Sequence, residues 1–432
     1  MKKIISVCKR VEGHGSVDII LKNDQISNIE FNLSIFRGFE NILKKKELFD
    51  IPKIASRICG LCHASQTIAS CKAIESLYNL KPKKQTTLLR RILMTGELIK
   101  SHSMHLFLQS LPDLLYLFKY EPNILSPYDL IQFDYELTNR FYELIKMGNE
   151  IDRLFGGRSI HAITPFPGGN VYKYSQKDLN MAKKLIKKTL ENIDYILNRY
   201  IELFAKLSPP EIFKLPNPTY LSLQNNEQYD RYTGIIRMNA KNNEQKNFFP
   251  DHYMKYFDKD PELRGIEFPK KELVLVGPLA RYHNIQKYSS DEIQSKIKTF
   301  DESWKDNILF SNILKLIEIY TEAEKCLTLL KEPILTENES LNSDFAIQND
   351  NGIGIVEAPR GTLMHHYHLD GDQNVDEIKL FIATEINIPI INRMLAGFSK
   401  DFYKKTGDME LVKKKAQMII RAFDPCISCA TH

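Results

Sequence analysis

Short alternating stretches of apolar and polar residues open the chain. Residues 3–7, 16–22 and 25–31 are rich in β-branched and other apolar side chains, and Gly13-His14-Gly15 and Asn23-Asp24 separate them. Alternation at a period of two, bounded by such turn residues, is typical of antiparallel strands. The first part of the chain, residues 1–50, is therefore predicted to be β-rich.

Most of the remaining chain has apolar residues at helical spacing. In residues 85–111, for example, Leu88, Ile92 and Ile99 recur at intervals of four and seven, which indicates an amphipathic helix. The proline-rich residues 208–218 and the polar residues 332–352 predict long loops. Further helical patterns cover residues 129–154, 177–207, 295–331 and 409–422.

These patterns predict a mainly α fold with a minor antiparallel β-sheet, of the α+β class. We expect one domain over residues 1–432, in which residues 51–432 form a mainly helical body. No repeat or low-complexity tract interrupts it.

Composition is that of an ordinary globular protein. Of the 432 residues, 43% are hydrophobic and 26% are charged, and the net charge is only +5. Scattered lysines favour solvated faces over a nucleic-acid groove, so we expect no nucleic-acid partner. No stretch approaches the roughly 18 apolar residues of a membrane span, and the start has too short an apolar run for a secretory signal. We expect a cytoplasmic protein.

Four of the seven cysteines form two Cys-x-x-Cys pairs, Cys59/Cys62 and Cys426/Cys429, near opposite ends of the chain. Each pair can present two thiolates to one metal ion. A zinc ribbon separates its pairs by roughly 15–20 residues, whereas here almost the whole chain lies between them. Spacing alone fits a shared four-thiolate site, two separate redox pairs, or unrelated buried cysteines. The isolated Cys8, Cys71 and Cys326 are expected to be small buried hydrophobes.

The sequence around both pairs resembles a known family. Arg-Ile-Cys-Gly-Leu-Cys at residues 57–62 and Asp-Pro-Cys-Ile-Ser-Cys-Ala-Thr-His at residues 424–432 resemble the paired signatures of the nickel-iron hydrogenase large, catalytic subunit. Further fragments in the family's order are Arg10–His14, Arg37–Glu40, Ser101-His102 with Leu111–Asp113, and Glu357–Gly361. The resemblance implies an α-rich subunit built around a long helical bundle. It also implies reversible heterolytic cleavage of H2.

The resemblance further implies a set of metal ligands. Cys59 and Cys426 would be terminal ligands of nickel, and Cys62 and Cys429 would bridge nickel to an iron that carries carbon monoxide and cyanide. Glu40 and His432 match the positions that hold a second metal, Mg²⁺ or Fe²⁺, near the C-terminus. Members of the family are often cut after this histidine, so the chain resembles a mature form.

Roles for four further residues follow from the same resemblance. Glu12 would move a proton away from Cys426, and Arg360 would lie over the metal pair, oriented by Asp424 and Asp113. From the residues alone, Glu12 also fits a surface carboxylate in a turn, Asp424 a residue that ends a helix before proline, and Asp113 a residue at a helix end.

Some histidines depart from, or mimic, the family's pattern. Where many members have a histidine that hydrogen-bonds a bridging thiolate, this chain has Gln66, and His63 follows Cys62 directly. Gln66 can donate a hydrogen bond but cannot carry charge. His102 and His105 have ligand-like spacing, but we expect them to be hydrogen-bonded histidines inside a packed helix.

Electron transfer requires partners, because three scattered cysteines cannot hold an iron-sulfur relay. The resemblance implies an iron-sulfur small subunit, together with further subunits linked to nicotinamide, deazaflavin or heterodisulfide reductase. No Gly-x-Gly-x-x-Gly fingerprint is present, so any dinucleotide would bind another subunit. Three alternatives are a quinone-binding respiratory subunit, which the four cysteines disfavour, a hydrogen sensor, and a structural zinc protein.

Overall fold

The computed structural model describes residues 2–33, 38–44, 46–120, 127–240, 244–260, 265–288, 290–337 and 346–432. Arg37 and residues 338–345 of the predicted loop 332–352 lie outside this part of the chain. Within it, helices predominate and the strands form several small sheets. The predicted α+β class is confirmed.

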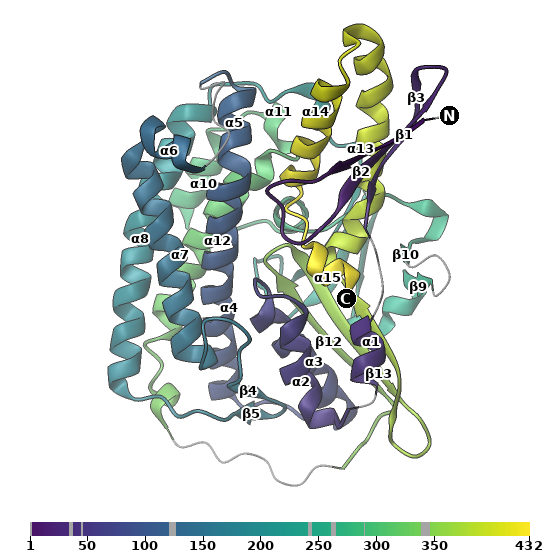
Figure 1. Cartoon of the computed structure of the whole chain (residues 1–432). Helices are drawn as coiled ribbons and strands as arrows, with labels where there is room; N and C mark the ends of the chain where they lie inside the picture. The colour runs from purple at the N-terminus through teal and green to yellow at the C-terminus, as the bar shows by residue number, and fades with distance from the viewer. Residues whose placement is uncertain are drawn as a thin grey trace.

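The N-terminal sheet matches its prediction closely. Strands β1 (Lys2–Val7), β2 (Ser16–Lys22) and β3 (Gln25–Asn32) pair in that order, all antiparallel. Asn23 and Asp24 form the two-residue turn between β2 and β3, with φ of 49° and 56°, as a tight hairpin requires. The sheet lies against the long C-terminal helices α13 (Ala383–Thr406) and α14 (Met409–Ala422) (Figure 1).

Four long helices form the bundle that the periodicity predicted. Helices α4 (Lys84–Met104), α7 (Tyr135–Gly156), α8 (Gln176–Phe204) and α12 (Phe310–Leu329) lie side by side (Figure 1). Contacts between α4 and α7, α7 and α8, α8 and α12, and α12 and α4 close the ring. Their apolar faces contribute a large part of the main hydrophobic core, which also includes residues of α3, the N-terminal sheet and the C-terminal helices.

Two predicted helices are interrupted by local signals, and a third is continuous. The pattern over 129–154 is divided into α6 (Pro127–Phe133) and α7 at Asp134, whose side chain caps α7 by accepting from Leu137 N. The pattern over 295–331 becomes α10 (Asp291–Lys298), α11 (Glu302–Lys305) and α12. The helical pattern over 85–111 continues from α4 through a π-helical segment, His105–Ser110, into α5 (Leu111–Leu117). The helical prediction over 85–111 is confirmed, because this segment stays helical throughout. In the other two ranges, Asp134 and Asp301 cap new helices, and such polar caps outweigh apolar periodicity.

The sheets beyond residue 200 were missed. Strands β12 (Asn351–Ala358), β13 (Gly361–Leu369) and β14 (Val375–Phe381) form one antiparallel sheet, and a second sheet has the order β11-β6-β7-β8. Strand β13 and the end of β12 are buried on both faces, so they lack the alternation that reveals a strand. The second sheet comprises β6 (Thr219–Gln224), β7 (Ile235–Asn239), β8 (Gln245–Phe248) and β11 (Val274–Leu275).

The remaining elements are short, apart from α3. The helices are α1 (Gly38–Leu43), α2 (Ile51–Ala55), α3 (His63–Leu77), α9 (Pro278–Asn284) and α15 (Ile427–Thr431). The strand pairs are β4 (Pro165–Phe166) with β5 (Gly169–Asn170), and β9 (Asp258–Asp260) with β10 (Gly265–Glu267). Over the described residues, no helix combines the length and hydrophobicity needed to cross a membrane.

Helix α3 lies directly on strand β12, with backbone against backbone. A Cβ atom added to Gly354 of β12 would lie 1.9 Å from the Ala69 carbonyl oxygen and 2.4 Å from Ala73 N. Only glycine permits this approach. The contact fixes α3, whose N-cap residue is Cys62.

Gly354→Ala is therefore expected to push α3 away from β12. Such overpacking typically costs about 1–3 kcal/mol, so the thermal unfolding midpoint of the holoprotein should fall. Gly371→Ala is the control, because no atom lies within 4 Å of a Cβ at that position. Equal midpoints for the two variants would contradict the close contact.

Candidate metal centre

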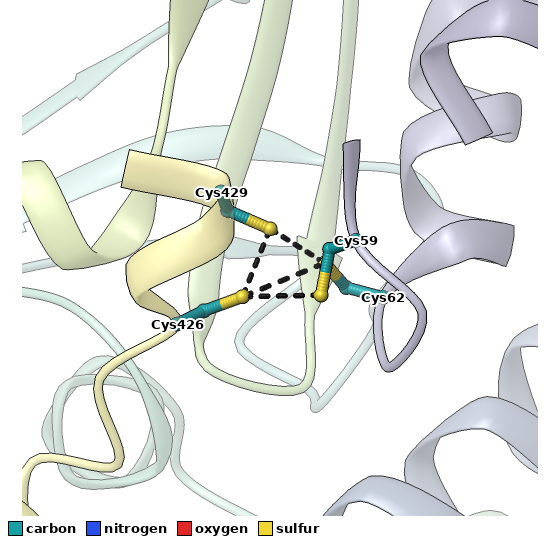
Figure 2. Close-up of side chains that lie close together, drawn as sticks. All are labelled: Cys59, Cys62, Cys426 and Cys429. Carbon is teal, nitrogen blue, oxygen red and sulfur yellow. Dashed lines mark hydrogen bonds between the residues drawn. The ribbon is translucent and has the colours of Figure 1, made fainter. Parts of the chain in front are cut away.

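The two Cys-x-x-Cys pairs meet inside the protein (Figure 2). Cys59 follows a 3-10 turn, Ser56–Ile58, and Cys62 is the N-cap of α3. Cys426 is the N-cap of α15, which carries Cys429. The four sulfur atoms lie within 4.8 Å of one another, and all four residues are buried. The fold therefore brings both ends of the chain to one site.

The sulfur atoms lie at or inside the spacing of ligands around a single metal ion. Sγ of Cys62 lies 2.8 Å from that of Cys429 and 4.0 Å from that of Cys426, and Cys59 Sγ lies 3.2 Å from Cys426 Sγ. Thiolates bound about 2.3 Å from one ion lie roughly 3.8 Å apart in a tetrahedron. None of the four is in a disulfide.

The electrostatics of these thiols call for a bound cation. Burial raises the pKa of Cys426 well above its usual range and that of Cys429 to about 11. A cation bound among the sulfur atoms would offset this cost and stabilise the thiolates. Four soft thiolate donors suit a late transition metal such as nickel. The residues present thus fit the metal that the sequence implied.

Glu12 lies beside the second pair. Its backbone carbonyl accepts from Ile427 N at 3.1 Å, and its carboxylate accepts from Ser428 N at 3.0 Å and Ser428 Oγ at 2.5 Å. Gly13 allows this approach, because its φ is +82° and a Cβ there would lie 2.9 Å from Ser428 N. Glu12 is half-buried rather than a freely exposed turn residue. Ser428, its partner, was not singled out from the sequence.

Arg360 occupies the turn between β12 and β13 and is held by Asp424. Its Nε donates to the Asp424 backbone carbonyl at 3.0 Å and to Asp424 Oδ1 at 3.1 Å. Lys315 Nζ donates to Asp424 Oδ2 at 2.6 Å. Burial opposes the charge of Asp424, but Arg360 and Lys315 outweigh it and hold the pKa of Asp424 well below its usual range. Asp424 also adopts a positive φ of 52° just before Pro425.

Ser101, not Asp113, is the other side chain beside Arg360. Arg360 Nη1 donates to Ser101 Oγ at 3.2 Å. The predicted pairing of Asp113 with Arg360 is wrong: Asp113 accepts from Arg421 Nε at 2.6 Å and from Arg10 Nη2 at 2.5 Å. Asp113 thus fastens α5 to the end of α14, just before Asp424. The motif Ser101-His102 could have identified Ser101 as a residue of the site.

The histidines near the motifs lie in hydrogen-bonded networks. His63 contacts Lys100 Nζ at 3.1 Å and Asp152 Oδ2 at 3.3 Å. His102 Nε2 contacts Glu318 Oε2 at 2.9 Å, and His105 Nε2 donates to the Arg421 carbonyl at 2.7 Å. Burial lowers the pKa of His102 to about 4 and that of His105 to about 3. Both are packed helix residues, as predicted.

The isolated cysteines are also as predicted. Cys8, Cys71 and Cys326 are buried and free. Burial raises the pKa of Cys8 to about 11 and that of Cys71 to about 12, so they remain neutral thiols.

Glu40 and His432 also meet, but around a lysine. His432 Nε2 lies 3.3 Å from Glu40 Oε1, and its Nδ1 donates to the Cys429 carbonyl at 2.7 Å. Lys259 Nζ lies 2.8 Å from Glu40 Oε1, 2.6 Å from the Leu380 carbonyl oxygen and 3.2 Å from His432 Nε2. An ammonium group therefore lies among the donors expected for the second metal.

A family model described as nickel-dependent hydrogenase matches residues 37–117 and 267–432. The chain belongs to the nickel-dependent hydrogenase family. It is an oxidoreductase that acts on H2, with its four cysteines gathered as this family's metal centre requires. The resemblance inferred from the sequence motifs is confirmed.

Individual relatives cover nearly the whole chain. One is a subunit of the F420-non-reducing hydrogenase vhu of Methanocaldococcus jannaschii, 26% identical over 93% of this chain and 100% of its own length. Another, the beta subunit of the NAD-reducing hydrogenase HoxS of Cupriavidus necator, is 28% identical over 100% of this chain and 94% of its own. A solved NAD+-reducing [NiFe]-hydrogenase superposes with a TM-score of 0.86 at 25% identity, and both chains are fully covered.

Asp113→Asn tests the role of the Asp113–Arg421 pair. Both side chains are buried, and removing one partner of a buried pair typically costs about 3–5 kcal/mol. We expect a marked fall in the thermal unfolding midpoint of the holoprotein. Asp50→Asn, which breaks the exposed Lys53–Asp50 pair, should shift it little, since exposed pairs contribute roughly 0–1 kcal/mol. An Asp113→Asn protein as stable as the control would contradict this structural role.

Proposed function

We propose that this chain is the catalytic subunit of a nickel-iron hydrogenase, with nickel held by Cys59, Cys62, Cys426 and Cys429. Cys59 and Cys426 are the terminal ligands, and Cys62 and Cys429 also bind an iron that carries carbon monoxide and cyanide. The observation that carries the proposal is the convergence of four buried sulfur atoms. Cys62 and Cys429 lie 2.8 Å apart, which is close enough for both to bind the iron. When bound, the metal centre supplies the site of heterolytic H2 cleavage.

Glu12 is the proton carrier in this proposal. Each H2 yields two protons and two electrons, and a basic thiolate such as that of Cys426 takes the first proton. Glu12 then receives this proton, because its backbone pairs with the residues around Cys426 and its carboxylate accepts from Ser428. A half-buried carboxylate within hydrogen-bond reach of a hydroxyl can pass a proton outward.

Arg360 and Asp424 shape the other side of the site. Arg360 is buried, and its Nη2 lies 3.1 Å from Asp424 Oδ1 but makes no hydrogen bond of suitable geometry to the described residues. This nitrogen can therefore still donate to a polar ligand at the metal centre. Asp424 fixes the guanidinium through Nε, and Ser101 fixes it through Nη1. Asp113 stabilises this arrangement indirectly, because it binds Arg421 and not Arg360.

Electrons leave through a partner in this proposal. Cys8, Cys71 and Cys326 are buried in separate elements, so an iron-sulfur small subunit must receive the electrons. The relatives' own names describe single subunits of F420-non-reducing and NAD-reducing hydrogenases. The NAD-reducing relative supports a nicotinamide-linked partner, whereas the F420-non-reducing relatives give no support to a deazaflavin link. We therefore propose a cytoplasmic complex whose further electron-transfer subunits are linked to nicotinamide, with heterodisulfide reductase as the alternative.

Magnesium or iron at Glu40 and His432 completes the proposal, on one condition. A carboxylate, an imidazole and the Leu380 carbonyl suit such an ion, but Lys259 Nζ lies among them. Metal binding therefore requires Lys259 to move away. Glu385, whose Oε2 lies 3.5 Å from Lys259 Nζ, is the nearby carboxylate toward which it can move.

Glu12→Gln tests the proton role. The substitution keeps the shape of the side chain and removes its titratable proton, so H2/D2O exchange by the holoenzyme should fall by about 100-fold or more. Nickel and iron content should remain unchanged. Glu30→Gln, at an exposed carboxylate, is the matched control. Exchange at the wild-type rate in Glu12→Gln would exclude this relay.

Metal analysis of Lys259→Met tests the second site. If magnesium or iron binds there, the variant should retain it at least as firmly as the wild type under chelator, because the competing ammonium is gone. Glu40→Gln should lose it. No magnesium or additional iron in either the wild type or Lys259→Met would mean that Lys259 is itself the cation of this site.

A further inference from the structure

A buried chain of hydrogen bonds leads from Cys429 to the centre of the β12–β14 sheet. Gln66 Nε2 donates to Cys429 Sγ at 3.7 Å, and Gln66 Oε1 lies 2.7 Å from His365 Nε2. His365 Nδ1 lies 2.7 Å from the Tyr367 hydroxyl, which lies 2.8 Å from Ser70 Oγ. None of these side chains is exposed to solvent. The chain links helix α3 to strand β13 directly behind a cysteine ligand.

The chemistry of each member determines the direction of these bonds. Burial lowers the pKa of His365 to about 3, so its imidazole is neutral and has one N–H donor and one acceptor nitrogen. An amide oxygen can only accept, so the proton of His365 lies on Nε2. Reversing Gln66 would place its oxygen against the Cys429 sulfur, which a thiolate disfavours. The thiolate therefore sets the orientation of Gln66, and the Nε2–H tautomer of His365 is the one that matches it.

We propose that His365 is a positioning residue for the metal centre, which acts through Gln66 to hold an N–H donor on the Cys429 sulfur. This inference rests on the proposed role of Cys429 as a metal-bound thiolate. Gln66 alone is a long, rotatable side chain, and its amide can present either the oxygen or the nitrogen to the sulfur. His365 removes that freedom, because it is a donor fixed within the sheet.

The consequence is electronic. A hydrogen bond to a metal-bound sulfur withdraws electron density from it and raises the reduction potential of the site. Without His365, Gln66 can rotate, and the Cys429 thiolate would donate more strongly to the metals. Carbon monoxide on iron reports this change, because added electron density weakens its C–O bond.

Infrared spectra of the anoxically purified complex test the inference. In His365→Phe, the metal-bound carbon monoxide band should move to lower wavenumber, and the nickel midpoint potential should fall. Gln66→Leu should give a shift of the same sign. Because His365 acts through Gln66, the double variant should match Gln66→Leu alone and not the sum of the two shifts.

His366→Phe is the matched control. His366 is the next residue on β13, is also buried, and contacts Tyr253 and Asn351 instead of Gln66. Its band should coincide with that of the wild type. An equal shift in His366→Phe and His365→Phe, or additive shifts in the double variant, would overturn the inference.

Two further results distinguish failure of the inference about His365 from failure of the proposed metal centre. If His365→Phe does not assemble its metals, Tyr367→Phe removes only the distant hydroxyl and should give a smaller shift of the same sign. An unmoved band in that variant would then count against the inference. Bands present in the wild type but unmoved in His365→Phe would overturn the inference alone. Their absence from the wild type would overturn the proposed metal centre and this inference with it.

Discussion

Four thiols gathered in a volume closed to water are the constraint on which the rest of the structure depends. Burial raises the pKa of the Cys426 and Cys429 thiols, so these two resist ionisation. Only a bound cation makes four thiolates acceptable there. Because the pairs come from opposite ends of the chain, the start of α3 and helix α15 must be brought together before the site exists (Figure 1).

The surroundings of the thiols are arranged by ionic contacts between buried groups. Lys315 and Arg360 converge on Asp424, and Arg421 reaches Asp113. Each of these charges has a partner, so none bears the full cost of desolvation. The result is a rigid setting on one side of the thiols. On another side, Glu12 lies half-buried against Ser428.

Much of the site was predictable because its residues lie in short contiguous motifs. The two cysteine pairs meet, and Asp424 bonds Arg360, as the motifs implied. Ser101 was missed although its motif was recognised, because a motif does not show which side chain its serine contacts. Asp113 was misassigned because a sequence does not reveal which buried arginine it faces. The strands around Arg360 were missed because burial on both faces removes alternation. The bonding of Lys259 with Glu40 and His432 joins residues that are distant in sequence, so only the fold could show it.

Elemental analysis of the complex, purified without oxygen and examined by infrared spectroscopy, tests the central claim most directly. A metal centre at the four cysteines predicts nickel and iron in the protein, together with bands of metal-bound carbon monoxide and cyanide. Substituting Cys429 with serine should remove those bands. Zinc in place of nickel, with no such bands in the wild type, would contradict the account and leave the four thiols as a structural site.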